Sequence, residues 1–137
     1  MLRAVIDTNV VLEGLTGKGE AGRVMDAWVR RAFVPCASTS LALEYEAVLL
    51  RRFPEQRHLM VQAALQALLN RAEYIPIHFQ LRPTSPDPGD DFVVECAFNA
   101  RAVLVTRNTR DFARPAANLK IPLHTSTSFL ALLVNQE

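Results

Sequence analysis

The sequence has little of what marks secreted, zinc-binding or membrane proteins. Its 137 residues include only two cysteines, Cys36 and Cys96, which lie far apart among apolar neighbours. A disulfide framework or a zinc site is therefore not expected, and each cysteine is expected to be a buried free thiol. No apolar run is long enough to span a membrane, and the amino terminus enters a strand-like segment without the pattern of a signal peptide. These absences favour a cytoplasmic protein with no membrane association.

An excess of charge of one sign is also missing. There are 15 Lys and Arg residues and 14 Asp and Glu residues, so the net charge of +1 neither indicates nor excludes a nucleic-acid partner. Lysine is rare, since only Lys18 and Lys120 occur, and the remaining positive charge is arginine, whose planar fork suits phosphate. Aromatic residues make up 7% of the chain and form no row suited to base stacking.

What the sequence contains is an alternation of strand-like and helix-like segments, without a repeat, a linker or a low-complexity tract. Its length is typical of one domain, which spans residues 1–137. The alternation predicts a three-layer α/β/α sandwich around a mostly parallel sheet of about five strands. Pro35 favours a sheet edge or a strand end for its segment. The expected strands are 3–7, 33–37, 73–77, 102–106 and 121–124; the expected helices begin near Asn9 and cover 20–31, 41–52, 55–72, 92–101 and 126–134, with a proline-rich loop over 81–89.

Two of the apolar runs end at clusters of oxygen-bearing side chains. In an open α/β sheet, ligands bind at the carboxyl ends of the strands. If the two runs are parallel neighbours, Asp7 and Asp111 meet there. Carboxylates gathered in this way repel one another, and a bound divalent cation with oxygen ligands is the usual resolution. The clusters are Asp7, Thr8 and Asn9 after residues 3–6, and Thr106, Arg107 and Asn108, with Asp111 just beyond, after residues 102–105.

Further acids lie at the starts of two expected helices. Glu44 and Glu46 both flank the apolar stripe of the helix over 41–52, and their spacing does not choose between them. Asp90 and Asp91 open another helix, where either would also serve as an N-cap. Capping a helix or a turn is likewise an alternative for the acids at the strand ends. Four acids at such positions together favour a site over four separate caps.

Four segments of the chain resemble the PIN domain nucleases, in the branch of the VapC-type toxins of bacterial toxin–antitoxin pairs. The resemblance spans nearly the whole chain and implies a PIN-like fold and a metal-dependent endoribonuclease. It selects Glu44 over Glu46 and Asp90 over Asp91. The segments are Ala4-Val5-Ile6-Asp7-Thr8-Asn9, Ser40-Leu41-Ala42-Leu43-Glu44-Tyr45, Asp90-Asp91-Phe92-Val93-Val94-Glu95-Cys96-Ala97 and Leu104-Val105-Thr106-Arg107-Asn108-Thr109-Arg110-Asp111-Phe112.

The resemblance also implies roles for individual residues. An acidic quartet would hold Mg²⁺ or Mn²⁺, which activates a water molecule for attack on the phosphodiester. Asn108 stands where the family often has aspartate, so either Asn108 or Asp111 completes the metal site. Two arginines would contact flanking phosphates, an interaction that weakens as salt rises. The implied quartet is Asp7, Glu44, Asp90 and Asp111, the supporting residues are Thr8, Asn9, Asp91, Thr106 and Asn108, and the phosphate contacts are Arg107 and Arg110.

The implied partners are an RNA substrate, a cognate antitoxin protein and a second copy of the chain in a homodimer. Two other functions stay open. One is a catalytically inactive PIN-like module that binds RNA or protein. The other, less favoured, is a phosphoacceptor receiver domain, whose late Lys-x-Pro is echoed by residues 120–122. The segment over 73–77 leads to His78 and Phe79, however, where a receiver needs its acceptor aspartate.

Overall fold

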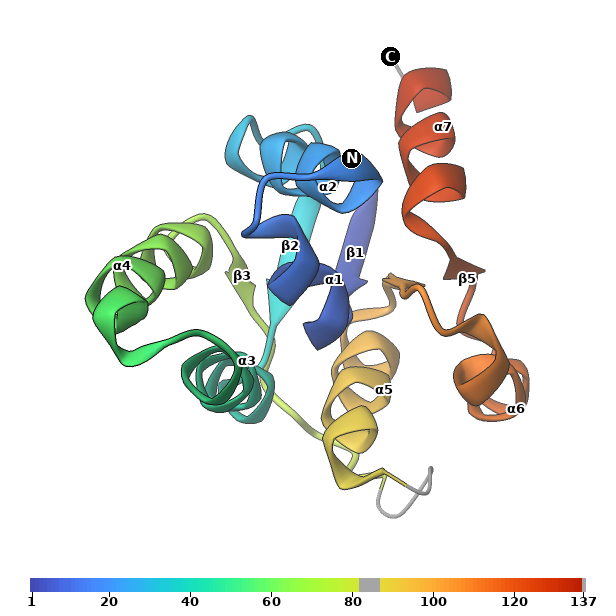
Figure 1. The fold of residues 1–137 in the computed structure, drawn as a ribbon. Coiled ribbons are helices and arrows are strands. Elements are labelled where there is room, and N and C mark those ends of the chain that lie inside the picture. The colour runs from blue at the N-terminus through green and yellow to red at the C-terminus, as the bar shows by residue number, and fades with distance from the viewer. Residues whose placement is uncertain (82–86, 137) are drawn as a thin grey trace.

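A five-stranded, all-parallel sheet forms the centre of the molecule, in a computed structural model that describes residues 1–81 and 87–136 (Figure 1). The predicted α/β fold is confirmed. The strand order β3-β2-β1-β4-β5 differs from the 2-1-3-4-5 order of receiver domains, which argues against that alternative. The strands are β1 (Arg3–Ile6), β2 (Val34–Ala37), β3 (Glu73–Tyr74), β4 (Val103–Val105) and β5 (Leu123–His124).

Most of the helices begin and end close to the predicted positions, and one α-helix was not predicted. Ser38 caps the third helix as its position suggests, because its hydroxyl accepts a hydrogen bond from the Leu41 amide. None of the helices within residues 1–81 and 87–136 is long and apolar enough to cross a membrane. The elements are α1 (Thr8–Gly14), α2 (Gly19–Val29), α3 (Thr39–Arg52), the 3-10 helix η1 (Glu55–Arg57), α4 (His58–Leu69), α5 (Pro88–Ala100), α6 (Thr109–Leu119) and α7 (Ser126–Gln136).

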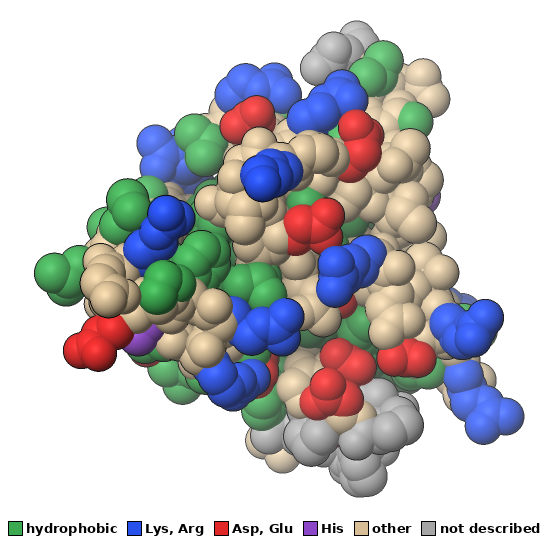
Figure 2. All heavy atoms as spheres, in the orientation of Figure 1, with side chains coloured by type: hydrophobic (Ala, Val, Ile, Leu, Met, Phe, Trp, Pro, Cys, Tyr) green, Lys and Arg blue, Asp and Glu red, His purple; other side chains and the backbone are tan. Residues whose placement is uncertain are grey.

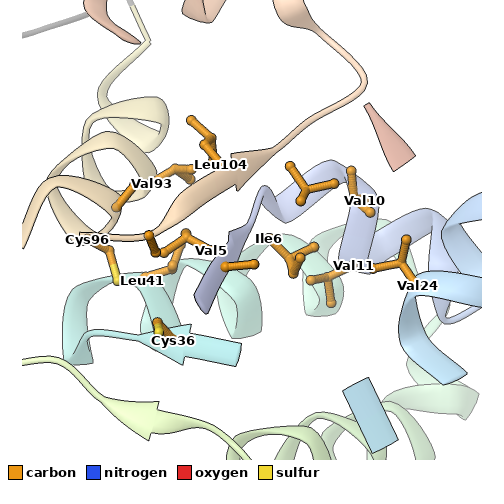
Figure 3. Close-up of a cluster of buried hydrophobic side chains, with 14 of the residues drawn as sticks. Val5, Ile6, Val10, Val11, Val24, Cys36, Leu41, Val93, Cys96 and Leu104 are labelled. Atoms are coloured by element: carbon orange, nitrogen blue, oxygen red, sulfur yellow. The ribbon is translucent and has the colours of Figure 1, made fainter. Parts of the chain in front are cut away.

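The core lies between the central strands and the helices on either side of the sheet. Val5 and Ile6 of β1 and Leu104 of β4 are fully buried, as expected for parallel strands covered on both faces. Figure 3 shows these side chains with Val10 of α1 and Cys96 of α5 in one apolar cluster. Both cysteines are buried free thiols, which confirms the prediction.

Strand β2 is an interior strand, so of the two positions that Pro35 favours, a sheet edge or a strand end, the sheet edge is wrong. The Val34 amide donates to the Leu2 carbonyl, on the side of β1. The nitrogen of Pro35 therefore faces the opposite neighbour, β3, whose first pair with β2 joins Glu73 to Cys36. Because β3 begins one residue later, the amide that proline lacks is not needed in the ladder.

Helix α6 was not predicted from the sequence, because the expected helices leave residues 109–119 unassigned. Pro115 lies inside this helix and removes one backbone hydrogen bond. Phe112, Pro115 and Ala116 are nevertheless all buried, at the i, i+3 and i+4 spacing of one helix face. Burial of that face offsets the lost bond.

Other boundaries differ at the loops. The helix expected over 55–72 is shorter, because η1 precedes α4, and the strand expected over 73–77 is only β3. The loop expected over 81–89 is shorter at its end, because α5 already begins at Pro88. Residues 82–86 of that loop lie outside the described residues. The first turn of α5 contains Gly89 and Asp90, and it lies at the carboxyl edge of the sheet.

Candidate active site

The carboxyl ends of β1 and β4 lie side by side. The two strands are parallel, with Ile6 paired to Val105, so the residues that follow them are neighbours. The Asp7 amide donates to the Val105 carbonyl at 2.8 Å. The Thr106 hydroxyl donates to Oδ2 of Asp7 at 2.7 Å. A shared site was expected if the two apolar runs were parallel neighbours in the sheet, and β1 and β4 are.

Asp7 occupies the N-cap position of α1, but its side chain makes no capping hydrogen bond. The carboxyl is only 3% exposed. Burial raises its pKa, while the hydrogen bond from Thr106, the amide of Thr8 and the charge of Arg107 act in the opposite direction. The Thr106 hydroxyl, just after the neighbouring strand, thus holds this buried carboxylate at the sheet edge.

Asn108 links this pair to the next acid. Its amide donates to the Thr106 hydroxyl at 3.0 Å, and its side-chain Nδ2 donates to Oδ2 of Asp111 at 2.6 Å. Its Oδ1 also accepts from the Asp111 amide and so caps α6. A continuous chain of hydrogen bonds therefore runs from Asp7 through Thr106 and Asn108 to Asp111.

Asp87 caps α5, a role that the sequence left open for Asp90 or Asp91. The Asp87 side chain accepts from the Gly89 amide at 2.9 Å. The sequence analysis missed this residue, although an aspartate followed directly by proline is a known signal of a helix start. With the cap supplied by Asp87, neither Asp90 nor Asp91 is needed as the N-cap of α5.

Asp90 lies in the field of the other acids. Burial and then the negative charges of Asp7, Asp87, Asp111 and Asp91 raise its pKa to about 7. Residues from the ends of two strands and the start of a helix thus act on one carboxyl. Figure 2 shows acidic side chains gathered near the start of α5, with basic side chains around them.

Glu44 also reaches the start of α5. A Cβ atom added at Gly89 would lie 3.1 Å from Oε1 of Glu44 and 3.4 Å from Oδ1 of Asp87. Glu44 is half-buried, whereas Glu46 is exposed. The absence of a side chain at Gly89 lets the Glu44 carboxyl approach the helix, and Glu44, not Glu46, therefore lies beside the acids.

Tyr45 is a structural contributor that the sequence analysis did not single out. It is completely buried, and its hydroxyl donates to the Ile6 carbonyl at 2.5 Å. Within the described part of the chain, β1 has two registered pairs with β2, at Arg3 and Ala4, and the Tyr45 hydroxyl satisfies a carbonyl beyond them, at the strand end. This bond fastens α3 to the end of β1 and holds the neighbouring Glu44 at the same edge.

The remaining predicted site residues differ in their exposure. Thr8 and Asp91 are buried, and Asn9 is exposed at the start of α1. Arg107 and Arg110 are both exposed on the segment that follows β4. The Arg107 guanidinium forms an ion pair with Glu13 of α1 at 3.2 Å. Its positive charge also acts on Asp7 and therefore lies near the acids.

The chemistry of the donor set fits a hard divalent cation. The groups at this edge are carboxylates, with amide and hydroxyl oxygens beside them, and such oxygens are the ligands that Mg²⁺ and Mn²⁺ prefer. Among residues 1–81 and 87–136, no three acidic, histidine or cysteine side chains already stand close enough together to hold an ion. Binding would therefore draw the carboxylates closer than they are in this structure.

Comparisons with known proteins identify the family and the fold. The sequence model of the PIN domain family matches residues 3–110, which contain Asp7, Glu44 and Asp90 and end just before Asp111. No curated protein matches the chain. In structure the chain is similar to VapBC2 from Rickettsia felis bound to a DNA fragment from the promoter, with 17% identity and a TM-score of 0.66 over 90% of this chain and 98% of that one.

Two further structures show the same fold. One is DNA-bound VapBC from Salmonella typhimurium, with 19% identity and a TM-score of 0.64, covering 92% of this chain and 99% of that one. The other is VapBC-1 from nontypeable Haemophilus influenzae, with 14% identity and a TM-score of 0.63, covering 92% and 99%. At these identities the likeness is one of fold.

Proposed function

The chain belongs to the PIN domain family, and from this premise we propose that it is a divalent-metal-dependent endoribonuclease that acts as the toxin of a toxin–antitoxin pair. One observation carries the proposal. A chain of hydrogen bonds links Asp7 after β1 through Thr106 and Asn108 to Asp111 in α6, and the negative charges of Asp7 and Asp111 contribute to the raised pKa of Asp90 in α5. A fold that gathers repelling carboxylates in one place favours the binding of a cation.

The charges explain why a cation is needed. A phosphodiester is itself anionic, so the carboxylates alone would repel it. When bound, Mg²⁺ or Mn²⁺ would reverse the local charge and supply the Lewis acidity that activates water. Asp7, Asp90 and Asp111 would hold the ion, with Glu44 as a further ligand or as the group that orients the attacking water.

The neighbouring residues would position these groups. The Thr106 hydroxyl holds Asp7 in one orientation, and the Asn108 amide group holds Asp111. Such partners around a metal site restrict the ligands that they contact. The exposed guanidinium groups of Arg107 and Arg110 would bind phosphates of the RNA on either side of the cleaved bond.

The proposed partners are inferred from the family and from the similar structures. The three similar structures are all of VapBC, two of them with DNA. For this chain we propose a cognate antitoxin, an RNA substrate and a homodimer in the cytoplasm.

Cleavage of a panel of structured RNAs tests the function. The wild-type protein is expected to cut with Mg²⁺ or Mn²⁺, to stop in a chelator, and to leave 5′-phosphate and 3′-hydroxyl ends. Asp7→Asn is expected to lower the rate of RNA cleavage by more than roughly 100-fold. This factor is the upper end of the loss when a residue that only contacts a metal ligand is removed. Cleavage that needs no cation, or equal cleavage by a folded Asp7→Asn protein, would contradict the proposal. RNA binding without cleavage would instead support the inactive PIN-like module.

A further inference from the structure

A second candidate site lies at the opposite end of α5 from the acids. A cavity of about 440 Å³ lies beside the carboxyl ends of α5 and α6, a size within the usual range for small-molecule sites. Arg101 lies eleven positions after Asp90 along α5, so the cavity is roughly 16 Å from the acidic site. Apolar side chains form part of its wall, and the side chains that matter here are His78, Phe79, Phe98, Asn99, Arg101 and Lys120.

The cavity carries positive charge. Arg101 and Lys120 follow the last residues of α5 and α6 and line it together, and among the residues that the structure describes no acidic side chain lines the cavity. Throughout residues 1–81 and 87–136, neither of these cations takes part in an ion pair. Both have left-handed backbone conformations, with φ of 54° and 59°, where glycine is the usual residue. Arg101 and Lys120 bring two positive charges to this cavity, and their charge is complementary to that of a phosphate.

An exposed aromatic ring stands beside these cations. Phe79 is 63% exposed, yet it is held in place. Its amide donates to Oδ1 of Asn99 at 3.0 Å, its carbonyl accepts from Nδ2 of Asn99 at 2.9 Å, and its ring meets that of Phe98 edge to face at 6.0 Å. A large ring that is exposed but fixed is suited to stack on a planar ligand.

We propose that this cavity binds one nucleotide, with the base against Phe79 and the phosphate between Arg101 and Lys120. The site is separate from the acids and does not depend on cleavage. The nucleotide comes either from solution, as a mononucleotide, or from an RNA chain that passes over this end of the molecule. The chemistry, an aromatic base with a phosphate, is the same in both cases.

Calorimetric titration of the full chain with AMP, in a chelator so that no divalent cation is present, tests the proposal. AMP is expected to bind more tightly than adenosine or ribose 5-phosphate alone. Lys120→Gly should weaken AMP binding by about tenfold or more, as expected for loss of a charged hydrogen bond. Phe79→Ala should weaken AMP binding by about fivefold or more and leave ribose 5-phosphate unchanged.

Arg31→Gly is the matched control. Arg31 is also a cation with a φ of 59°, but it does not line this cavity. Glycine suits this backbone conformation, so both glycine variants are expected to fold. Arg31→Gly should leave AMP binding unchanged, which separates the local charge from the general loss of one positive charge.

A tetranucleotide RNA in the same chelator distinguishes the two sources. If Lys120→Gly weakens its binding as much as that of AMP, the site takes a nucleotide of an RNA chain; if only AMP responds, the site takes a free mononucleotide. Absence of AMP binding by the wild type, or equal AMP binding by Lys120→Gly, Phe79→Ala and the wild type, would overturn the proposal. Because no cleavage is measured, this failure is distinct from failure of the nuclease assignment.

Discussion

At the acidic site, the fold holds single carboxyl groups in surroundings that disfavour their charged form. The pKa of Asp7 is raised by burial, and that of Asp90 is raised to about 7 by burial and by four neighbouring carboxylates. The sequence placed Asp7 and Asp111 beyond the ends of two apolar runs, and only the family resemblance selected Asp90 over Asp91. Asp87 was not predicted as the cap of α5, although the proline that follows it is a signal of a helix start.

The pH dependence of stability follows from the pKa of Asp90. A carboxyl whose pKa is higher in the folded than in the unfolded protein binds its proton more tightly when folded. Without cations, the free energy of unfolding should therefore be greatest below about pH 4 as far as this group is concerned, and should fall as the pH rises toward 7. Asp90→Asn should stabilise the cation-free protein at pH 8 by about 1 kcal/mol after allowance for solvent screening.

Urea denaturation at pH 5 and pH 8 in a chelator measures this effect. Asp26→Asn, at an exposed position of α2, is the matched control and should leave the difference between the two pH values unchanged. A loss of stability by Asp90→Asn at pH 8 would show that the carboxylates do not repel one another as the structure implies.

Thr106 should matter to cleavage through its hydroxyl alone. Thr106→Val keeps the shape but leaves Oδ2 of Asp7 and the Asn108 amide without this partner. We expect a 10- to 100-fold loss of kcat/KM, the range for partners of metal ligands, and about 1 kcal/mol of stability. Thr106→Ser retains the hydroxyl and should keep most of the activity. Equal activity of the valine and serine variants in RNA cleavage would contradict the positioning role.

At the scale of elements, each acid lies on a different helix or strand end. The orientation of a helix decides which of its acids faces the site. Glu44 and Glu46 were equivalent in the spacing of the sequence, and only the family resemblance chose between them. The packing of α3 on the end of β1, through Tyr45 and Ile6, turns Glu44 toward Gly89 and leaves Glu46 exposed.

A pair of neutral substitutions in α3 tests that orientation. Glu44→Gln should lower RNA cleavage at least tenfold, whereas Glu46→Gln, the matched control on the same helix, should change it less than twofold. Both should unfold within about 0.5 kcal/mol of the wild type, as is usual for substitutions away from the core. Greater damage from Glu46→Gln would mean that α3 presents a different face to the site.

The contact between α1 and α2 depends on a glycine. A Cβ atom at Gly14 would lie 2.4 Å from Cγ of Met25 and 2.8 Å from the Ala21 carbonyl oxygen, and the latter is backbone that cannot turn aside. Gly14→Ala should therefore destabilise the protein by about 1–3 kcal/mol, as overpacking does. Urea denaturation measures this loss, and Ala substitution of the adjacent exposed Glu13 is the control, with an expected change below about 1 kcal/mol. A neutral Gly14→Ala would show that the two helices can separate without cost.

At the scale of the whole molecule, cation binding should be coupled to folding. A ligand that binds only the folded state stabilises it, by about 1.4 kcal/mol at ten times its dissociation constant. Mg²⁺ or Mn²⁺ should thus raise the Tm of the wild type by a few degrees, and more at pH 8 than at pH 5, because protonated carboxyls bind cations poorly. Thermal unfolding with and without the cation measures the shift. An equal rise for Asp7→Asn would place the binding elsewhere.

The sequence by itself determined the alternation of strands and helices, the buried cysteines and the oxygen-bearing clusters that follow β1 and β4, because these depend on local periodicity and on which residues follow an apolar run. Tertiary structure alone decided the interior place of β2, the existence of α6 with Pro115 inside it, and the approach of Glu44 to Gly89. Each of these depends on which segments become neighbours: β3 begins beyond Pro35, the core buries one face of α6, and β1 fixes the rotation of α3. Contacts between residues distant in the chain are set by packing, which the local pattern does not contain.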